Sequence, residues 1–450
     1  MENMPFCGAI QYNDWWYAIS ISNRNEEPFV GLFIRWFSNP QLTDKTEKRN
    51  FINVQIDAVG IGITSAVSQF LAVFLTLLGA SNFQVGMLTS MPALTGFLLA
   101  IPVGNFLQSR RRIVPWFSAA RLSVITCYVL TGVVTMVAPP DWSVVAVLII
   151  WAVATLPQTV LSITFSVVMN AVAGPSGRFE LMSRRWAILG FTTAIAALVV
   201  GQVLDSIHFP VNYQVVFIAT AAGGVISYYF SSRIAIPENT AASLQRPRFS
   251  FAQQYREYMH IIATEKPFIS FVIKRTVFLT GTTLGIPLFP IYFVRVVELS
   301  NSWIAGITTA QTAVMVIGYF YWTRQSRARG SRPVLIWTTM ALALYPIFVA
   351  FTTEPWVIVV LAGSVGIFQA GLDLVFFDEL INTIPPEFSA TFVSFAQSLQ
   401  YFSSIISPLL GTFLADQFGV STALIVAGAV RLAGSFLFLF GTPARKPASA

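Results

Sequence analysis

The chain has 450 residues, of which 55% are hydrophobic and only 10% are charged. A soluble domain typically carries about 25% charged residues, so this composition excludes a protein whose whole surface faces water. The net charge of +7 is spread over short polar segments rather than gathered on one soluble face, which argues against a nucleic-acid-binding protein.

Long apolar stretches, separated by glycine, proline and charged residues, predict twelve membrane-spanning helices. Each stretch is close to or longer than the roughly 20 residues that a helix needs to cross a bilayer. The stretches also lack the two-residue alternation of barrel strands, so the sequence predicts an all-α integral membrane protein. In chain order, the predicted spans cover residues 52–78, 83–107, 113–138, 142–171, 185–205, 211–232, 267–294, 302–322, 333–352, 355–381, 390–415 and 420–440.

One long polar segment divides the spans into two sets of six. This segment, residues 233–266, contains Pro237, Pro247 and charges of both signs, as is typical of a linker. The predicted organisation is an N-terminal tail, a six-helix bundle, a linker, a second six-helix bundle and a C-terminal tail, over residues 1–50, 51–232, 233–266, 267–441 and 442–450.

Basic residues are distributed unevenly over the predicted loops. With a cytoplasmic N-terminus, the inner loops and the two tails hold 22 of the 27 lysines and arginines, whereas the outer loops hold only Arg295. Two clusters, Arg110–Arg112 and Arg324–Arg332, follow the second and eighth spans, and Arg185 falls in another inner loop. This asymmetry predicts a multi-pass protein of the cell (inner) membrane with both termini in the cytoplasm.

The two halves of the chain share short matches at a slowly drifting offset. The segment SNFQVGMLTS at Ser81 resembles SNSWIAGITT at Ser300, 219 residues later. Four later matches follow in the same order: Pro115 with Pro333, Gln158 with Gln369, Gly201 with Gly411, and Phe209 with Phe418. Ordered matches predict a duplication. Because each half crosses six times, both halves enter from the same side, which predicts a pseudo-two-fold axis along the membrane normal.

The segment after the second span is a degenerate form of a known loop motif, G-x-x-x-D-R/K-x-G-R/K-R/K, with Gly104 at its start and Arg110–Arg112 at its basic end. With the two bundles, the linker and the basic loops, it makes residues 49–442 resemble a bacterial major facilitator superfamily transporter. The resemblance implies alternating access around a central cavity lined by spans 1, 4, 7 and 10. The sequence departs from the motif at Gln108, where the family's acid latches the two halves, and at Ser109. It also lacks the G-P-x-x-G signature of drug antiporters.

Polar residues inside the implied cavity helices are candidates for function, because a polar group in hydrocarbon is costly unless it faces water or a partner. Asn53 and Asp57 lie four residues apart in span 1, and Gln158 and Ser162 lie four apart in span 4, so each pair shares a helix face. Two simpler interpretations of Asp57 stay open, a hydrated carboxylate at a helix end and an ion pair with a loop arginine. A serine often only bonds back to its own helix.

Spans 7 and 10 add charged candidates. Lys274 and Arg275 are adjacent, so their side chains point about 100° apart and at most one faces the cavity centre. Gln369 and Asp373 share a face of span 10 in the register of Gln158. A carboxylate inside a span is expected either to bind and release protons as access alternates or to pair with a basic residue.

Taken together, these residues favour a secondary active transporter that moves a small solute by alternating access, coupled to protons. Its expected partners are a small-molecule substrate, protons and the lipid bilayer, and the chain is expected to be a monomer. Two arginines within spans are expected to be structural, with Arg121 extending to the inner surface and Arg431 satisfying carbonyls or a carboxylate between helices.

Two alternatives are a transporter fold that senses or scaffolds without transport, and a polytopic membrane enzyme. No catalytic residues and no cofactor are expected, because the sequence has no nucleophile–base pattern. Two cysteines and two histidines, widely separated, predict neither a disulfide framework nor a metal site.

Overall fold

The computed structural model describes residues 44–108, 110–236, 264–383 and 389–440. Most of the predicted tails and of the predicted linker, residues 233–266, lies outside these residues. All regular elements within the described ranges are α-helices, which confirms the predicted fold class.

The first bundle begins earlier than the sequence suggested. Its first helix starts at Lys45 rather than at residue 52, because the side chain of Asp44 caps it and accepts a hydrogen bond from the Glu47 N–H (3.3 Å). The helices of this bundle are α3 (Lys45–Ser68), α4 (Phe70–Leu77), α5 (Asn82–Gln108), α6 (Val114–Val137), α7 (Pro140–Ser206) and α8 (Val211–Ser232).

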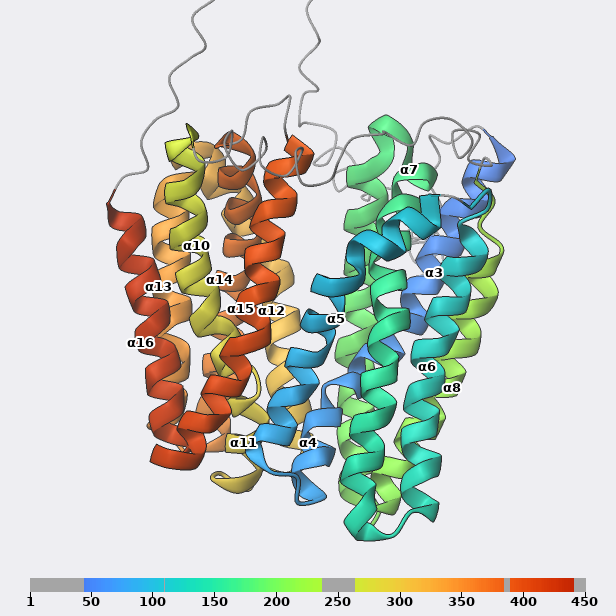
Figure 1. The fold of residues 1–450 in the computed structure, drawn as a ribbon, viewed down its shortest axis with the longest axis vertical. Coiled ribbons are helices and arrows are strands. Elements are labelled where there is room, and N and C mark those ends of the chain that lie inside the picture. The colour runs from blue at the N-terminus through green and yellow to red at the C-terminus, as the bar shows by residue number, and fades with distance from the viewer. Residues whose placement is uncertain (1–43, 109, 237–263, 384–388, 441–450) are drawn as a thin grey trace, which may run out of the picture.

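The second bundle follows the same plan and lies beside the first (Figure 1). Its helices are α10 (Lys266–Gly285), α11 (Leu288–Arg295), α12 (Asn301–Arg329), α13 (Ser331–Ala350), α14 (Pro355–Asn382), α15 (Ser389–Phe418) and α16 (Val420–Leu439).

The helix α7 contains two membrane spans. A straight helix of its 67 residues would extend about 100 Å at about 1.5 Å per residue, far more than a bilayer requires. Its two apolar stretches are Trp142–Ala173 and Arg184–Ser206. By length and composition, ten stretches of the described residues can cross a membrane. The helices α5 and α15, of 27 and 30 residues, pack against each other and complete twelve spans.

The duplication predicted from the sequence is visible in the helix packing. α3 meets α8 at Gly60, where a Cβ would lie 2.5 Å from the carbonyl oxygen of Gly223 and 2.8 Å from the backbone nitrogen of Ser227. α10 meets α16 in the same way at Gly281, where a Cβ would lie 2.7 Å from the backbone nitrogen of Arg431. In both bundles, therefore, the first and the last helix cross at a glycine.

Both bundles also interrupt their first span. α3 stops at Ser68 and α4 continues it, whereas α10 stops at Gly285 and α11 continues after Pro287. Proline cannot donate a backbone hydrogen bond, which explains the second interruption. The short helices α4 and α11 pack against each other where the two bundles meet (Figure 1).

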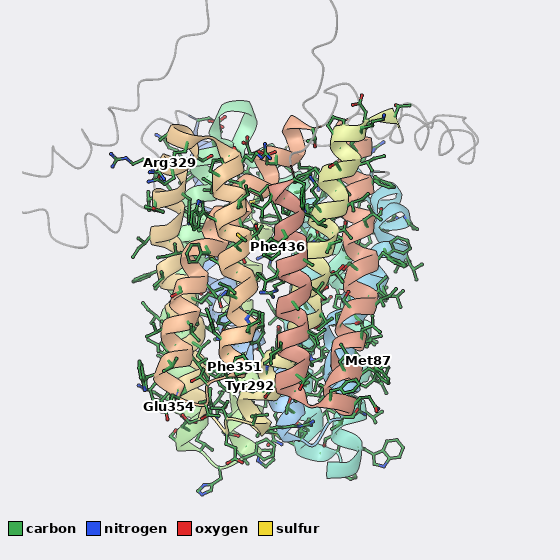
Figure 2. The ribbon with its side chains drawn as sticks, turned by 90° about the vertical axis from the view of Figure 1, so that its left-hand side faces the viewer. Met87, Tyr292, Arg329, Phe351, Glu354 and Phe436 are labelled. Carbon is green, nitrogen blue, oxygen red and sulfur yellow. The ribbon has the colours of Figure 1, made fainter. Side chains whose placement is uncertain are left out.

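The two ends of the molecule differ in charge and packing. We call the end where α3 begins and α8 ends the basic end, because it holds Arg110–Arg112 and Arg329. The opposite end is the α4/α11 end. Figure 2 shows Arg329 at the basic end of α12, with Phe351 and Glu354 toward the α4/α11 end.

Buried apolar side chains of the described residues form one shared cluster and two separate ones. The shared cluster lies at the α4/α11 end and includes Phe74 of α4 and Tyr292 of α11. Phe74 stacks on Tyr213 of α8, with ring centroids 4.9 Å apart. Toward the basic end each bundle has its own cluster, around Phe117 in the first and Phe271 in the second. The bundles thus share an apolar core at one end only.

Candidate functional site

Asp57 lies in a buried charge cluster within the first bundle. Its side chain in α3 is fully buried, and Oδ1 accepts hydrogen bonds from Arg121 of α6 (3.0 Å) and from the hydroxyl of Ser227 of α8 (2.6 Å). Oδ2 lies 3.8 Å from a guanidinium nitrogen of Arg185 of α7. One carboxylate therefore faces two cations, in surroundings where an unpaired charge would be very costly. The cluster joins four helices.

Arg121, Arg185 and Asn53 have surroundings that differ from those predicted from the sequence. Arg121 and Arg185 were expected at the inner surface, but each is only 3% exposed. Both are drawn inward by Asp57, because a buried carboxylate needs cationic or hydrogen-bonding partners. Asn53, one turn before Asp57, donates to the backbone carbonyl of Arg233 (3.2 Å) and so fixes the end of α8.

The polar face predicted for span 4 is partly accessible. Gln158 is half-buried and Ser162 is exposed. Thr155, three residues before Gln158, is buried and is joined to Thr95 of α5 by a hydroxyl–hydroxyl hydrogen bond (2.8 Å). Thr155 therefore holds helices together, whereas Gln158 and Ser162 stay at least partly accessible.

Lys274 and Arg275 diverge on α10, as adjacent residues on a helix must. Lys274 is 8% exposed and donates from Nζ to the backbone carbonyl of Phe440, after the end of α16 (2.6 Å). Arg275 is half-buried and donates to Oε1 of Gln400 in α15 (3.0 Å). Because α15 packs against α5 of the first bundle, Arg275 is the member of the pair that reaches a helix at the bundle boundary.

Asp373 is an exposed carboxylate within a predicted span. Its Oδ1 accepts a hydrogen bond from Gln369, one turn earlier in α14 (2.7 Å), and its Oδ2 accepts one from the hydroxyl of Tyr319 in α12 (3.0 Å). A carboxylate is too polar to face acyl chains at this depth, so its exposed position requires water or a polar ligand beside it. Gln369 and Asp373 lie on one face of α14, as their spacing predicts, and are hydrogen-bonded to each other, and Tyr319 joins them from a second helix.

The loop motif after α5 is organised around aromatic rings. The guanidinium carbon of Arg110 lies 4.1 Å from the ring centroid of Phe106 and 5.5 Å from that of Trp116. Arg110–Arg112 are exposed. Gly104 is helical, and nothing lies within 4 Å of the position that a Cβ would take.

A hydrogen-bonded contact joins the bundles at the α4/α11 end. Asp205, near the end of α7, accepts hydrogen bonds from the backbone N–H groups of Asn301 (2.9 Å) and Ser302 (2.8 Å). These are the first residues of α12, so a carboxylate of one bundle caps a helix of the other. The Asn301 side chain also bonds to Asp205 and to the hydroxyl of Tyr213.

A second contact repeats this arrangement across the pseudo-two-fold axis. Asn82, at the start of α5, donates to Oδ1 of Asp416 near the end of α15 (2.6 Å). Asn82 and Asn301 are 219 residues apart, as in the sequence repeat, and Asp205 and Asp416 are 211 apart. The second contact additionally contains Arg295 of α11, which donates to Oδ1 of Asn82 (2.5 Å). The only arginine predicted for the outer loops thus belongs to the contact between bundles.

Sequence reasoning missed several of these residues. Asn82 and Asp205 lie inside the repeated segments, but a repeat by itself indicates duplication and not a contact between the bundles. A polar residue that recurs at equivalent helix ends was the available signal. Tyr319 and Gln400 carried no such signal, because a single tyrosine or glutamine in a span is common and its partner lies on another helix.

A sequence model described as Major Facilitator Superfamily matches residues 275–450 of the chain. No curated protein matches the chain by sequence.

Solved structures share the fold over most of the chain. A bacterial homologue of the human lysosomal transporter Spinster, in an inward-facing conformation, is 13% identical with a TM-score of 0.61, covering 89% of this chain and 96% of its own. A mutant form of the nucleoside transporter NupG is 12% identical with a TM-score of 0.64, covering 87% and 99%. A bacterial metal transporter is 14% identical with a TM-score of 0.61, covering 89% and 99%. The C-terminal part of the chain thus matches the model described as Major Facilitator Superfamily, and the whole chain shares the fold of these solved transporters.

Proposed function

We propose that this protein is a secondary active transporter that moves a small solute by alternating access. The observation that carries the proposal is the uneven junction between the bundles. They share one apolar core and two polar contacts at the α4/α11 end, and have separate cores toward the basic end. Such a junction suits two rigid bundles that rock about a site between them, with one entrance closed.

The proposed orientation has the basic end in the cytoplasm of a cell whose inner membrane holds the protein. Arg110–Arg112 and Arg329 lie at that end, and the positive-inside rule favours it as the cytoplasmic side. The α4/α11 contact then closes the outer entrance. Reporter fusions after residues 112 and 329 test this orientation, and a cytoplasmic signal is expected from both.

The proposed substrate region contains Gln158, Arg275 and the group formed by Gln369, Asp373 and Tyr319. The amide, guanidinium and hydroxyl groups supply hydrogen-bond donors, and Arg275 favours a solute that carries a negative charge or strong acceptors. Asp57 is less suited to direct contact with a solute, because it is fully buried against Arg121 and Arg185. We propose that it positions α3 instead.

Two measurements test transport itself. Purified protein is first screened by thermal shift against sugars, amino acids, organic anions, nucleosides and metal ions, because a ligand that binds the folded state raises the unfolding temperature. Any ligand that stabilises the protein is then tested for flux in proteoliposomes, with and without a pH gradient. A ligand that binds but shows no flux, either with or without the pH gradient, would contradict the transport proposal and favour the sensor alternative.

Proton coupling is proposed for Asp373, because its carboxylate lies within a span and has hydrogen-bonding partners on two helices. Asp373→Asn removes the titratable proton and keeps the shape. We expect gradient-driven accumulation to be abolished while solute exchange continues. Glu354→Gln, an equal charge change at an exposed position of the α4/α11 end, is the matched control and should transport normally. Accumulation by Asp373→Asn at the wild-type level would exclude this assignment.

One observation favours the alternative of a fold that senses or scaffolds without transport. Gln108 and Ser109 stand where the loop motif has its acid and the next residue, so the usual latch at that position is missing. The contacts of Asp205 and Asp416 at the α4/α11 end provide a different latch, which makes the transport proposal the stronger one.

A further inference from the structure

A basic pocket lies outside the substrate region, at the basic end of α5 and α6. It is lined by Arg110, Arg111, Arg112, Pro115 and Trp116, and its volume is ≈ 490 Å³. Among the described residues no carboxylate lines it, and the sequence has no aspartate or glutamate from residue 58 to residue 140. Three guanidinium groups therefore line a pocket whose own segment of chain contains no acid.

The pocket is held in shape by stacking. The rings of Phe106 and Trp116 meet edge to face, with centroids 4.8 Å apart, and the Arg110 guanidinium lies over both. Stacking occupies the faces of a guanidinium and leaves its N–H edge available to acceptors. In addition, Arg110 N–H donates to the Leu107 carbonyl (3.0 Å), which fixes the chain as it leaves α5.

The position of the pocket relative to α6 identifies the kind of anion. The pocket lies at the N-terminus of this helix of 24 residues, where the helix dipole adds partial positive charge. From Trp116 onward, one face of α6 exposes apolar side chains at helical spacing, which is the face expected against acyl chains. Its large members are Trp116, Leu122, Leu130, Val133 and Val137.

We infer that this pocket binds the phosphate of an anionic phospholipid headgroup in the cytoplasmic leaflet, with an acyl chain along the exposed face of α6. Guanidinium groups bind phosphate oxygens through paired hydrogen bonds, and Trp116 lies in the first turn of α6, the kind of position at a span's end where tryptophan favours the membrane interface. The anionic lipids of that leaflet supply phosphate at this depth and at high local concentration. The loop motif of this chain, which has Gln108 in place of the acidic residue, would thus bind lipid, a role that does not require the acidic residue.

Native mass spectrometry of the intact detergent-purified protein tests the inference. Dioleoyl phosphatidylglycerol is titrated against the wild type, with dioleoyl phosphatidylcholine and inorganic phosphate as the comparison ligands. We expect tight binding of one phosphatidylglycerol and much weaker binding of the other two. Equal binding of phosphatidylcholine would overturn the anionic specificity. Inorganic phosphate that binds as tightly and displaces the lipid would overturn the assignment to a lipid.

Three variants separate the pocket from general surface charge. The triple substitution Arg110→Gln, Arg111→Gln and Arg112→Gln should weaken phosphatidylglycerol binding by roughly 100-fold, since each basic residue near the surface contributes strongly to binding anionic lipid. The matched control removes the same charge from the other basic cluster, through Arg324→Gln, Arg327→Gln and Arg329→Gln, and should bind the lipid as the wild type does. Equal losses in both would show only diffuse attraction and would overturn the site.

A charge-preserving variant keeps the test decisive if the glutamine variant misfolds or inserts incorrectly. Replacing Arg110–Arg112 by three lysines retains the positive-inside signal but removes the paired hydrogen bonds and the planar stacking. We expect binding about tenfold weaker than in the wild type. Unchanged binding by the lysine variant would overturn the role of the guanidinium pocket.

Discussion

At the scale of single residues, charged groups in this molecule fall into two kinds of environment. Asp57 in the first bundle and Arg431 in the second are buried, and Arg431 donates to the backbone carbonyls of Leu342 (3.1 Å) and Thr282 (3.4 Å). Arg431 therefore satisfies carbonyls between helices, as expected from the sequence. Asp373, by contrast, is exposed and bound by neutral donors. The first kind lies between packed helices of a bundle, and the second is the kind that the proposed proton coupling requires.

The buried cluster leads to a prediction about stability. Asp57→Asn leaves Arg121 and Arg185 facing each other without a counter-charge, and breaking a buried pair in this way typically costs about 3–5 kcal/mol. We expect a clear fall in the thermal unfolding temperature of the purified protein. Asp44→Asn changes the same charge at the exposed N-cap of the same helix and should be nearly neutral, because asparagine also caps well.

A double variant distinguishes an ion pair from a general packing role. The double variant Asp57→Asn with Arg121→Gln should lose less stability than the sum of the losses in the two single variants, because neither group is then left unpaired by removal of the other. Strict additivity would show that the two side chains do not depend on each other.

At the scale of helices, the first and the last helix of each bundle can cross closely because the residue at the crossing, Gly60 or Gly281, has no side chain. A Cβ at Gly60 or at Gly281 would lie within 2.8 Å of backbone atoms of the neighbouring helix, which cannot move as a flexible side chain would. Small residues let helices approach closely in membranes, where packing rather than the hydrophobic effect drives association.

Alanine substitutions at the two crossing glycines and at Gly104 should change the stability of the protein in opposite directions. Gly60→Ala and Gly281→Ala should each destabilise by about 1–3 kcal/mol through overpacking. Gly104→Ala meets open space within a helix and should be neutral or stabilising by up to about 1 kcal/mol. Thermal unfolding of the three purified variants measures the difference. A similar loss at Gly104 would mean that this motif glycine is required for a close approach that occurs in another state.

The N-terminus of α12 is capped by Asp205, which belongs to the other bundle. Loss of an N-cap typically costs about 0.5–2 kcal/mol, and here the cap belongs to the other bundle, so the cost falls only on the state in which the bundles touch. Asp205→Ala should therefore shift the balance toward opening of the α4/α11 end by roughly 2- to 30-fold.

Distances between spin labels at Phe209 and Phe418 measure this shift, since both residues are exposed and belong to different bundles. The labels are placed in a background with Cys7 and Cys127 changed to serine. Glu354→Gln serves as the control for charge removal at the same end. An unchanged distance distribution in Asp205→Ala would show that the cap does not contribute to closing the entrance.

At the scale of the whole molecule, sequence patterns predicted the number of spans, the two bundles and their parallel relation. Hydrophobic length determines whether a helix can span a bilayer, and that property is local. The charge cluster of Asp57 was only half anticipated, because the pairing of Arg121 with it depends on how three helices pack. The contact of Asp205 with α12 was not anticipated at all, since a helix-end carboxylate gives no sign of which helix it caps.

At the same scale, the proposed mechanism requires the bundles to separate at the α4/α11 end, where they share an apolar core, once in each transport cycle. A covalent link there should stop the cycle without affecting either bundle. A Cβ at Gly86 would lie 3.0 Å from the side chain of Thr412 across the bundle boundary, so Gly86→Cys with Thr412→Cys is within reach of a disulfide.

In the cysteine-free background, we expect the oxidised double variant to lose flux of whichever solute the thermal-shift screen identifies, and reduction to restore it. Each single cysteine variant, oxidised in parallel, should keep its flux, which separates the link from the substitutions. Solute binding should survive cross-linking when the solute enters from the basic end, because that end is not constrained by the link. Full flux through the linked protein would mean that the bundles do not rock about this contact, and alternating access as proposed would fail.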